Sequence, residues 1–219
     1  MASATALGPR LLAEAIGTLV LLAVVVGSGI MGVRLGAGND AVALLANAGA
    51  TAAALYVLIC VLGPLSGAHF NPLVSLVSWW RGELSRRDCL AYIPVQTVAA
   101  LAGVLLAHAM FELPLLQAGS KLRCGPAQWL SEVIATAGLV LTIVLGVRHR
   151  AAAVPALVAS WIFAAYWFTA STSFANPAVT LARAFTDTFA NIRLVDVGPF
   201  VLAQLLGGVL ALALLRRLK

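Results

Sequence analysis

The chain has 219 residues, of which 62% are hydrophobic and only 10% are charged, and its mean hydropathy is +1.00. A soluble domain carries about 25% charged residues, so this composition excludes an ordinary water-soluble globular protein. The formal net charge of +6 arises from basic residues in short connections and at the chain ends. Membrane topology accounts for such a distribution, and no nucleic-acid partner is expected.

Six apolar stretches are long enough, or nearly so, to cross a lipid bilayer as helices, since about 20 residues span the hydrocarbon core. They predict an all-α integral membrane protein with a single domain over residues 1–219, and a first span that is retained rather than cleaved. In chain order the expected spans are 11–32, 41–63, 89–111, 127–147, 152–170 and 197–215.

The basic residues are distributed unequally between the two sides of this predicted bundle. Nine of the fourteen Lys and Arg residues fall on the side that holds both termini and the second and fourth connections. Because an excess of Lys and Arg marks the cytoplasmic side, both termini are expected to be cytoplasmic. The opposite side holds Arg34, Lys121, Arg123, Arg183 and Arg193.

The two halves of the chain resemble each other at three places that occur in the same order. LAEAIGT at 12–18 pairs with LSEVIAT at 130–136, FNPLVSL at 70–76 with ANPAVTL at 175–181, and Gln96 with Gln204. These matches predict two repeats, 1–112 and 126–219, each with three spans. An odd number of spans inserts the second repeat upside down, an arrangement that builds sites near the membrane midplane.

Each repeat contains an Asn-Pro pair in an apolar stretch, Asn71-Pro72 and Asn176-Pro177. Asn favours the N-cap and Pro the first helical position, and the apolar runs that follow are too short to cross a bilayer. We therefore expect re-entrant half-helices at about 72–80 and 177–186, with N-termini that meet and repel cations. Each Asn amide should be free to donate into a pore. A lone Asn-Pro pair usually marks a loop turn, but two at equivalent positions favour the pore.

Residues 66–72, Ser-Gly-Ala-His-Phe-Asn-Pro, and residues 173–178, Ser-Phe-Ala-Asn-Pro-Ala, are similar to the paired signature loops of the major intrinsic protein family, the aquaporins and aquaglyceroporins. The resemblance covers nearly the whole chain. It implies an aquaporin-like bundle of six transmembrane helices and two re-entrant half-helices, usually assembled as a homotetramer. Such a protein conducts small neutral solutes across the lipid bilayer without a cofactor, a metal or catalytic residues.

The resemblance also implies roles for individual side chains. The pore motifs would be Asn71, Pro72 and Leu73 in the first loop and Asn176, Pro177 and Ala178 in the second. From the residues alone, Glu14 and Glu132 could either reach water near the membrane boundary or be buried. Family members bury these carboxylates and use them to hold the loops. His69 is either a packed side chain or, as we favour, a polar group beside the pore.

The chain departs from the family pattern at the selectivity filter. Most members carry an arginine two residues after the second signature Pro, where this chain has Val179, and the first signature ends in Leu73 where alanine is usual. Position 180, an acid in typical glycerol facilitators, is Thr180. A filter without that guanidinium should be wider and less polar, which makes larger neutral solutes plausible.

Spacing identifies the other filter positions. Thr51 lies twenty residues before Asn71, and Ser173 lies three before Asn176. The position in the fifth span is Ala164 or Tyr166, depending on the direction of counting, and the sequence does not choose between them.

Residues 165–174 resemble a bacterial branch of the family that is associated with arsenic resistance. This resemblance implies a bacterial inner-membrane pore for arsenious acid, methylated arsenicals, glycerol and water. The alternatives are an atypical water-selective aquaporin and a secondary transporter built on an inverted repeat, although the spans lack obvious ion-coupling groups. An enzyme is not expected, because the chain has neither a metal-ligand cluster nor a nucleophile with its base.

Overall fold

The computed structural model describes residues 5–218, and all regular structure in that range is helical. By length and composition, six of its helices can cross a membrane. They are α1 (Leu7–Leu35), α2 (Asp40–Ser66), α4 (Arg86–Met110), α5 (Pro126–His149), α6 (Val154–Phe168, preceded by the 3₁₀ turn Ala151–Ala153) and α8 (Leu194–Arg217). The predicted all-α membrane fold is confirmed.

The two short helices are α3 (Pro72–Trp80) and α7 (Pro177–Ala182). The α-helical part of α7 is shorter than the expected 177–186, because the chain tightens into the 3₁₀ turn Arg183–Phe185. With nine and six residues, neither helix can cross a bilayer.

Local sequence signals set several helix ends. The side chain of Asn39 accepts hydrogen bonds from the backbone of Ala41 and Val42 at the start of α2, and Ser85 caps α4 in the same way. Gly67 follows the last residue of α2, and its φ of 90° lies in the left-handed region where glycine is favoured. The chain can therefore turn sharply inward toward α3.

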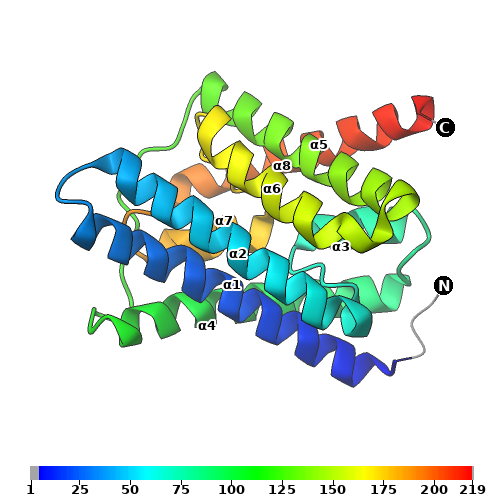
Figure 1. Cartoon of the computed structure of the whole chain (residues 1–219), viewed down its shortest axis with the longest axis horizontal. Coiled ribbons are helices and arrows are strands. Elements are labelled where there is room, and N and C mark those ends of the chain that lie inside the picture. The colour runs from blue at the N-terminus through cyan, green and yellow to red at the C-terminus, as the bar shows by residue number, and fades with distance from the viewer. Residues whose placement is uncertain (1–4, 219) are drawn as a thin grey trace.

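The long helices lie alongside one another, with the start of α1 and the end of α8 at the same end of the bundle (Figure 1). α1 packs against α2 and α4, α5 packs against α8 and α6, and α2 closes the bundle against α6. α3 and α7 lie inside and come from opposite ends (Figure 1). They contact each other, and both contact α4 and α8.

Polarity in this bundle is reversed relative to a soluble protein. Large apolar side chains such as Val98 and Leu206 are 66% and 63% exposed on the outer surface. Glu14, Gln96 and Glu132, in contrast, are fully buried. This distribution suits a protein whose outer surface contacts lipid.

Glycines let the helices approach closely. A Cβ at Gly103 of α4 would overlap the Leu19 carbonyl of α1 and lie 2.9 Å from the Cβ of Leu22. Small residues have this role at helix contacts in membranes, where close van der Waals packing drives association.

Gly103→Ala is expected to lower the melting temperature of the detergent-solubilised protein, because the added methyl forces α1 and α4 apart at a cost of about 1–3 kcal/mol. Thermal unfolding followed by near-ultraviolet circular dichroism measures the effect. Gly198→Ala on α8 is the matched control, since a Cβ there meets nothing within 4 Å. A Gly103→Ala protein as stable as the control would contradict this account of the α1/α4 contact.

Candidate functional site

A cavity of about 490 Å³ runs through the interior of the bundle. Asn71 and Asn176 contribute to its wall, and both begin the short helices. Glu83, beyond the end of α3, lines the cavity, and so does Arg183, beyond the end of α7. The cavity therefore extends past both half-helices, toward opposite ends of the bundle.

The two Asn side chains cap their own helices and also connect the two loops. Oδ1 of Asn71 accepts from the backbone N–H of Leu73 at 2.9 Å, and Oδ1 of Asn176 accepts from Ala178 and Val179 at 3.0 and 3.3 Å. In the other direction, Asn71 Nδ2 donates to the Ala175 carbonyl, and Asn176 Nδ2 donates to the Phe70 carbonyl, both at 2.8 Å.

These reciprocal bonds hold the N-termini of α3 and α7 against each other. The expectation of a free Asn amide needs a correction, because one amide hydrogen of each Asn is used across the contact between the loops. The second hydrogen remains for the cavity, since each amide has two.

Glu14 of α1 is fully buried and holds the loop before α3. Its carboxylate accepts from the Ser66 hydroxyl at 2.7 Å and from the backbone N–H groups of His69 and Phe70 at 2.9 and 2.7 Å. Gln96 Nε2 adds a fourth bond at 2.8 Å. The alternative that this carboxylate reaches water is thereby excluded.

Glu132 of α5 makes the equivalent set of bonds to the loop before α7. Its carboxylate accepts from the Ser171 hydroxyl at 2.6 Å and from the N–H groups of Phe174 and Ala175 at 2.9 Å each. Gln204 Nε2 donates to it at 2.7 Å. Each loop is thus held by one buried carboxylate with four donors.

The carboxylates determine which way the loop carbonyls face. A trans peptide directs its C=O opposite to its N–H, so the carbonyls of Ala68 and His69 point away from Glu14. The carbonyls of Ser173 and Phe174 point away from Glu132 by the same argument. All four residues line the cavity, which therefore has a row of acceptors along one side.

The loops adopt strained backbone conformations to reach this geometry. Ala68 and Phe70 have φ values of 49° and 48°, and Ser173 and Ala175 have 50° and 48°. Such left-handed conformations cost roughly 1–2 kcal/mol for a residue with a Cβ. Hydrogen bonds to a charged acceptor contribute about 1.5–3 kcal/mol each and can offset that cost.

The proposed filter residues other than Ala164 share the wall of this cavity. Thr51, Ser173 and Val179 all line it, and so does Tyr166, whose hydroxyl lies 3.5 Å from Thr51 Oγ1. Ala164 is exposed on the outside of α6 and is not part of the wall. The geometry therefore favours Tyr166 for the position that sequence spacing left open.

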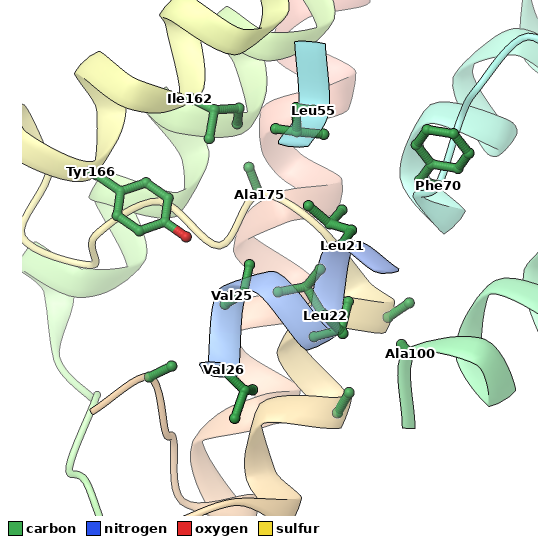
Figure 2. Close-up of a cluster of buried hydrophobic side chains, with 14 of the residues drawn as sticks. Leu21, Leu22, Val25, Val26, Leu55, Phe70, Ala100, Ile162, Tyr166 and Ala175 are labelled. Atoms are coloured by element: carbon green, nitrogen blue, oxygen red, sulfur yellow. The ribbon is translucent and has the colours of Figure 1, made fainter. Parts of the chain in front are cut away.

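Part of the cavity wall is apolar. Leu21, Val25, Leu55 and Ile162 form part of this wall. Figure 2 shows them beside Tyr166, whose side chain points away from its own helix. Sequence reasoning did not identify these four residues, because they look like any other apolar residue of a span.

In the first signature loop, His69 lines the cavity, whereas Leu73 packs elsewhere. His69 lines the cavity, with Nδ1 3.0 Å from Ser75 Oγ and its ring edge-on to Tyr92. Leu73 lies outside the wall, in an apolar cluster, and a Cβ at Gly208 would come within 3.1 Å of it. The absence of a side chain at Gly208 thus leaves room for the unusual leucine.

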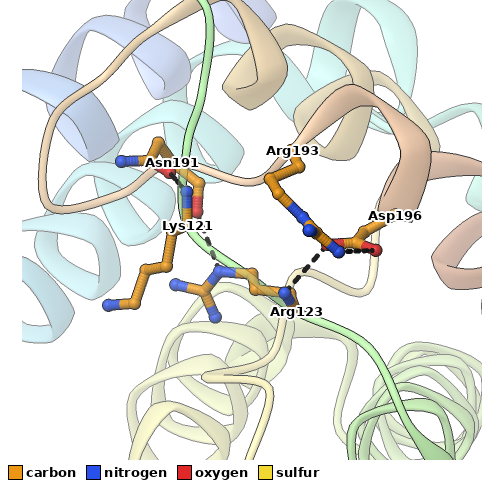
Figure 3. A network of polar contacts seen from close by, with 5 residues as sticks. All are labelled: Lys121, Arg123, Asn191, Arg193 and Asp196. Atoms are coloured by element: carbon orange, nitrogen blue, oxygen red, sulfur yellow. Dashed lines mark hydrogen bonds and ion pairs between the residues drawn. The ribbon is translucent and has the colours of Figure 1, made fainter.

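A polar network ties the connection between α4 and α5 to the segment before α8 (Figure 3). Arg123 donates from its backbone to Asp196 at 2.9 Å and from Nε to the Asn191 carbonyl at 2.8 Å. The Lys121 N–H donates to Asn191 Oδ1, and Arg193 pairs with Asp196.

Two of the five basic residues expected on the side opposite the termini are buried. Arg123 is 4% exposed and Arg183 is 1% exposed. Arg183 also lines the cavity and was missed as a site residue. The signal that could have found it is its place four residues after Val179, on the same face of a helix.

The chain is similar to several known proteins. The model of the family described as Major intrinsic protein matches residues 2–167, a match that ends before the second Asn-Pro pair. Over 207 residues, which are 94% of this chain and 88% of the relative, the chain is 61% identical to a protein named Aquaglyceroporin AqpS from Rhizobium meliloti (strain 1021).

The fold is similar to the X-ray structure of the aquaglyceroporin from Plasmodium falciparum. The TM-score is 0.73, and the likeness covers 94% of each chain. Because only 16% of the residues are identical, this likeness concerns the fold alone.

Glu132→Gln is expected to destabilise the protein by about 3 kcal/mol, because glutamine has an NH₂ group in place of one carboxylate oxygen. That NH₂ group cannot accept a hydrogen bond and would face the donors that the oxygen now binds. Thermal unfolding in detergent measures the loss. Glu112→Gln, at an exposed carboxylate, is the control and should leave the melting temperature unchanged. Equal melting temperatures for the two variants would refute the loop-holding role of Glu132.

Proposed function

The chain belongs to the major intrinsic protein family, and from this premise we propose that it is an aquaglyceroporin-type pore that conducts arsenious acid, methylated arsenicals, glycerol and water. Family membership makes it a multi-pass membrane channel for small neutral solutes and not an enzyme. The choice of solutes is our proposal.

The observation that carries this proposal is the composition of the cavity near Val179. The cavity is lined by apolar side chains such as Leu21, Val25 and Ile162 and also by residues whose carbonyls point away from Glu132, so it has apolar and hydrogen-bonding parts. A polyol or a small trihydroxide such as arsenious acid fits this division, with its hydroxyl groups donating to the carbonyls. Valine in place of the usual arginine leaves room for solutes larger than water.

Exclusion of cations and protons follows from the helix ends. α3 and α7 direct their N-termini at the middle of the cavity, where each carries about half a positive charge. A water molecule that accepts from the Asn amides there cannot take part in a continuous proton wire. A neutral solute passes these dipoles without comparable repulsion.

An atypical water-selective channel is the second candidate, and one contact favours it. The Tyr166 hydroxyl donates to Thr51 Oγ1 at 3.5 Å, and the bulk of this tyrosine in the cavity wall favours a narrow passage. A secondary transporter is less favoured, because Glu14 and Glu132, which are buried beside the loops, are fully used as acceptors.

We infer the remaining organisation from the same family. Residues 1–112 and 126–219 form two inverted repeats, and their equivalence is supported by the matching bonds of Glu14 and Glu132. Both termini lie in the cytoplasm of a bacterial cell, with the protein in the inner membrane as a homotetramer. Burial of Arg123 and Arg183 supports the orientation, because only Arg34, Lys121 and Arg193 then remain as basic residues on the outer side that are not buried.

Val179→Arg is expected to reduce glycerol and arsenious acid entry by about tenfold or more while water permeation is retained, because the guanidinium fills the constriction. Stopped-flow light scattering on proteoliposomes measures all three solutes. Val179→Leu adds volume without charge or donors and separates steric from electrostatic effects. Solute entry that is the same in Val179→Arg and the native protein would place the constriction elsewhere.

Tyr166→Ala is expected to admit larger polyols than the native protein passes, because it removes the ring that narrows the cavity beside Thr51. Swelling of proteoliposomes in a series of polyols of increasing length measures the size limit. Ala164→Leu on the outer face of α6 is the matched control and should leave the limit unchanged. The opposite pattern would assign the fifth-span position to Ala164.

A further inference from the structure

We propose that Arg183, together with Ser173, forms a polar binding site one helical turn beyond Val179, where the guanidinium binds oxygen atoms of passing neutral solutes and repels cations. This inference rests on the proposed channel function and names the residues that set its selectivity. It also explains how a pore without an arginine at position 179 retains a fixed positive charge.

The position of Arg183 follows from the helix that precedes it. The backbone N–H of Arg183 donates to the carbonyl of Val179, so helical geometry continues past the end of α7. Residues four apart share one helix face, and both side chains line the cavity. Arg183 therefore follows Val179 along the same passage.

Two polar atoms at this level have no partner within the protein. Nη1 of Arg183 and Oγ of Ser173 are buried, and neither has a hydrogen-bond partner among residues 5–218. Arg183 is 1% exposed and Ser173 is 3% exposed. Leaving a buried donor unpaired costs about 1–3 kcal/mol, so most such groups are paired. A hydroxylated solute would supply the missing partner, accepting from Nη1 and exchanging a hydrogen bond with Ser173.

The guanidinium of Arg183 is held rigidly. Its Nε donates to the Ala190 carbonyl, and its Cζ lies 3.4 Å from the centre of the Phe174 ring. Phe174 is itself fixed edge-on against Phe200. A planar guanidinium stacked on an aromatic ring is preorganised, so a solute that binds it loses little free energy in ordering the side chain.

Arg123 provides the contrast that singles out Arg183. Its guanidinium lies 4.8 Å from the same Phe174 ring, yet it does not line the cavity. Its Nε and Nη1 donate to the carbonyls of Asn191 and Ser171 at 2.8 Å each. Arg123 thus holds the surrounding loops, whereas Arg183 has a donor left for a ligand.

Arg183 gives the wall at this end of the cavity a positive charge, whereas Arg123 does not line it. Burial lowers the pKa of Arg123 to about 10, which still leaves it charged at neutral pH. Neither guanidinium is in an ion pair with a carboxylate of the described residues. The only carboxylate in the wall, Glu83, lies beyond α3 at the other end. A cation entering past α7 would meet the guanidinium of Arg183, which forms no ion pair with a carboxylate of the described residues.

The test compares the native protein with Arg183→Gln, Arg183→Lys, Ser173→Ala and the control Arg123→Gln in proteoliposomes. Stopped-flow light scattering reports water, glycerol and arsenious acid, and an entrapped sodium-sensitive dye reports cation leak. Arg183→Gln should lower glycerol and arsenious acid entry relative to water by about tenfold and allow sodium to leak. Arg183→Lys should restore sodium exclusion without restoring the solute ratio.

Ser173→Ala should reduce the glycerol-to-water ratio while sodium stays excluded. Arg123→Gln should lower the melting temperature and leave both permeation readouts unchanged, because its donors are used within the protein. If Arg183→Gln does not fold, Arg183→Lys and Ser173→Ala decide the question, and native solute ratios in both would overturn the site.

The failure of this inference is distinguishable from failure of the proposed function. A native protein that passes no neutral solute would overturn the proposed function and this inference with it. Native solute entry, combined with an unchanged glycerol-to-water ratio and no sodium leak in folded Arg183→Gln, would overturn only the role of Arg183.

Discussion

Two carboxylates buried within the helix bundle hold the re-entrant loops, and the shape of the cavity depends on them. Glu14 and Glu132 each accept two backbone N–H groups from a loop that a membrane interior could not otherwise hydrate. Those bonds offset the strain of the left-handed residues and turn the neighbouring carbonyls toward the cavity. The hydrogen-bonding side of the pore is therefore produced by side chains that do not line it.

The half-helices are too short to be stable alone, and each depends on the other half of the chain. α7 has six α-helical residues, far fewer than an isolated helix needs. Asn71 and Asn176 cap their own helices and donate to the opposite loop, so the two N-termini are held at the same point. The electrostatic barrier to cations that we propose therefore depends on both half-helices together.

The residue proposed to set the width of the cavity and the residue that carries its positive charge are different. Val179 leaves the proposed constriction without a guanidinium, while Arg183 supplies one a turn later, stacked on Phe174 and with an Nη1 that has no hydrogen-bond partner among residues 5–218. A charge at that place can bind hydroxyl oxygens and repel cations without filling the space beside Tyr166. In the proposed pore, this arrangement would reconcile the passage of solutes larger than water with the exclusion of ions.

The sequence by itself determined the number of spans, the two helix starts at Asn-Pro and the family, because lipid imposes span length and helix caps are local. It could not say whether Ala164 or Tyr166 faces the cavity, since that depends on how α6 is rotated about its axis. It could not show that Arg183 is buried in the cavity wall, because an arginine after a short helix looks like a loop charge. Only the packing of both halves around one axis decided these points, because it brings together residues about a hundred positions apart.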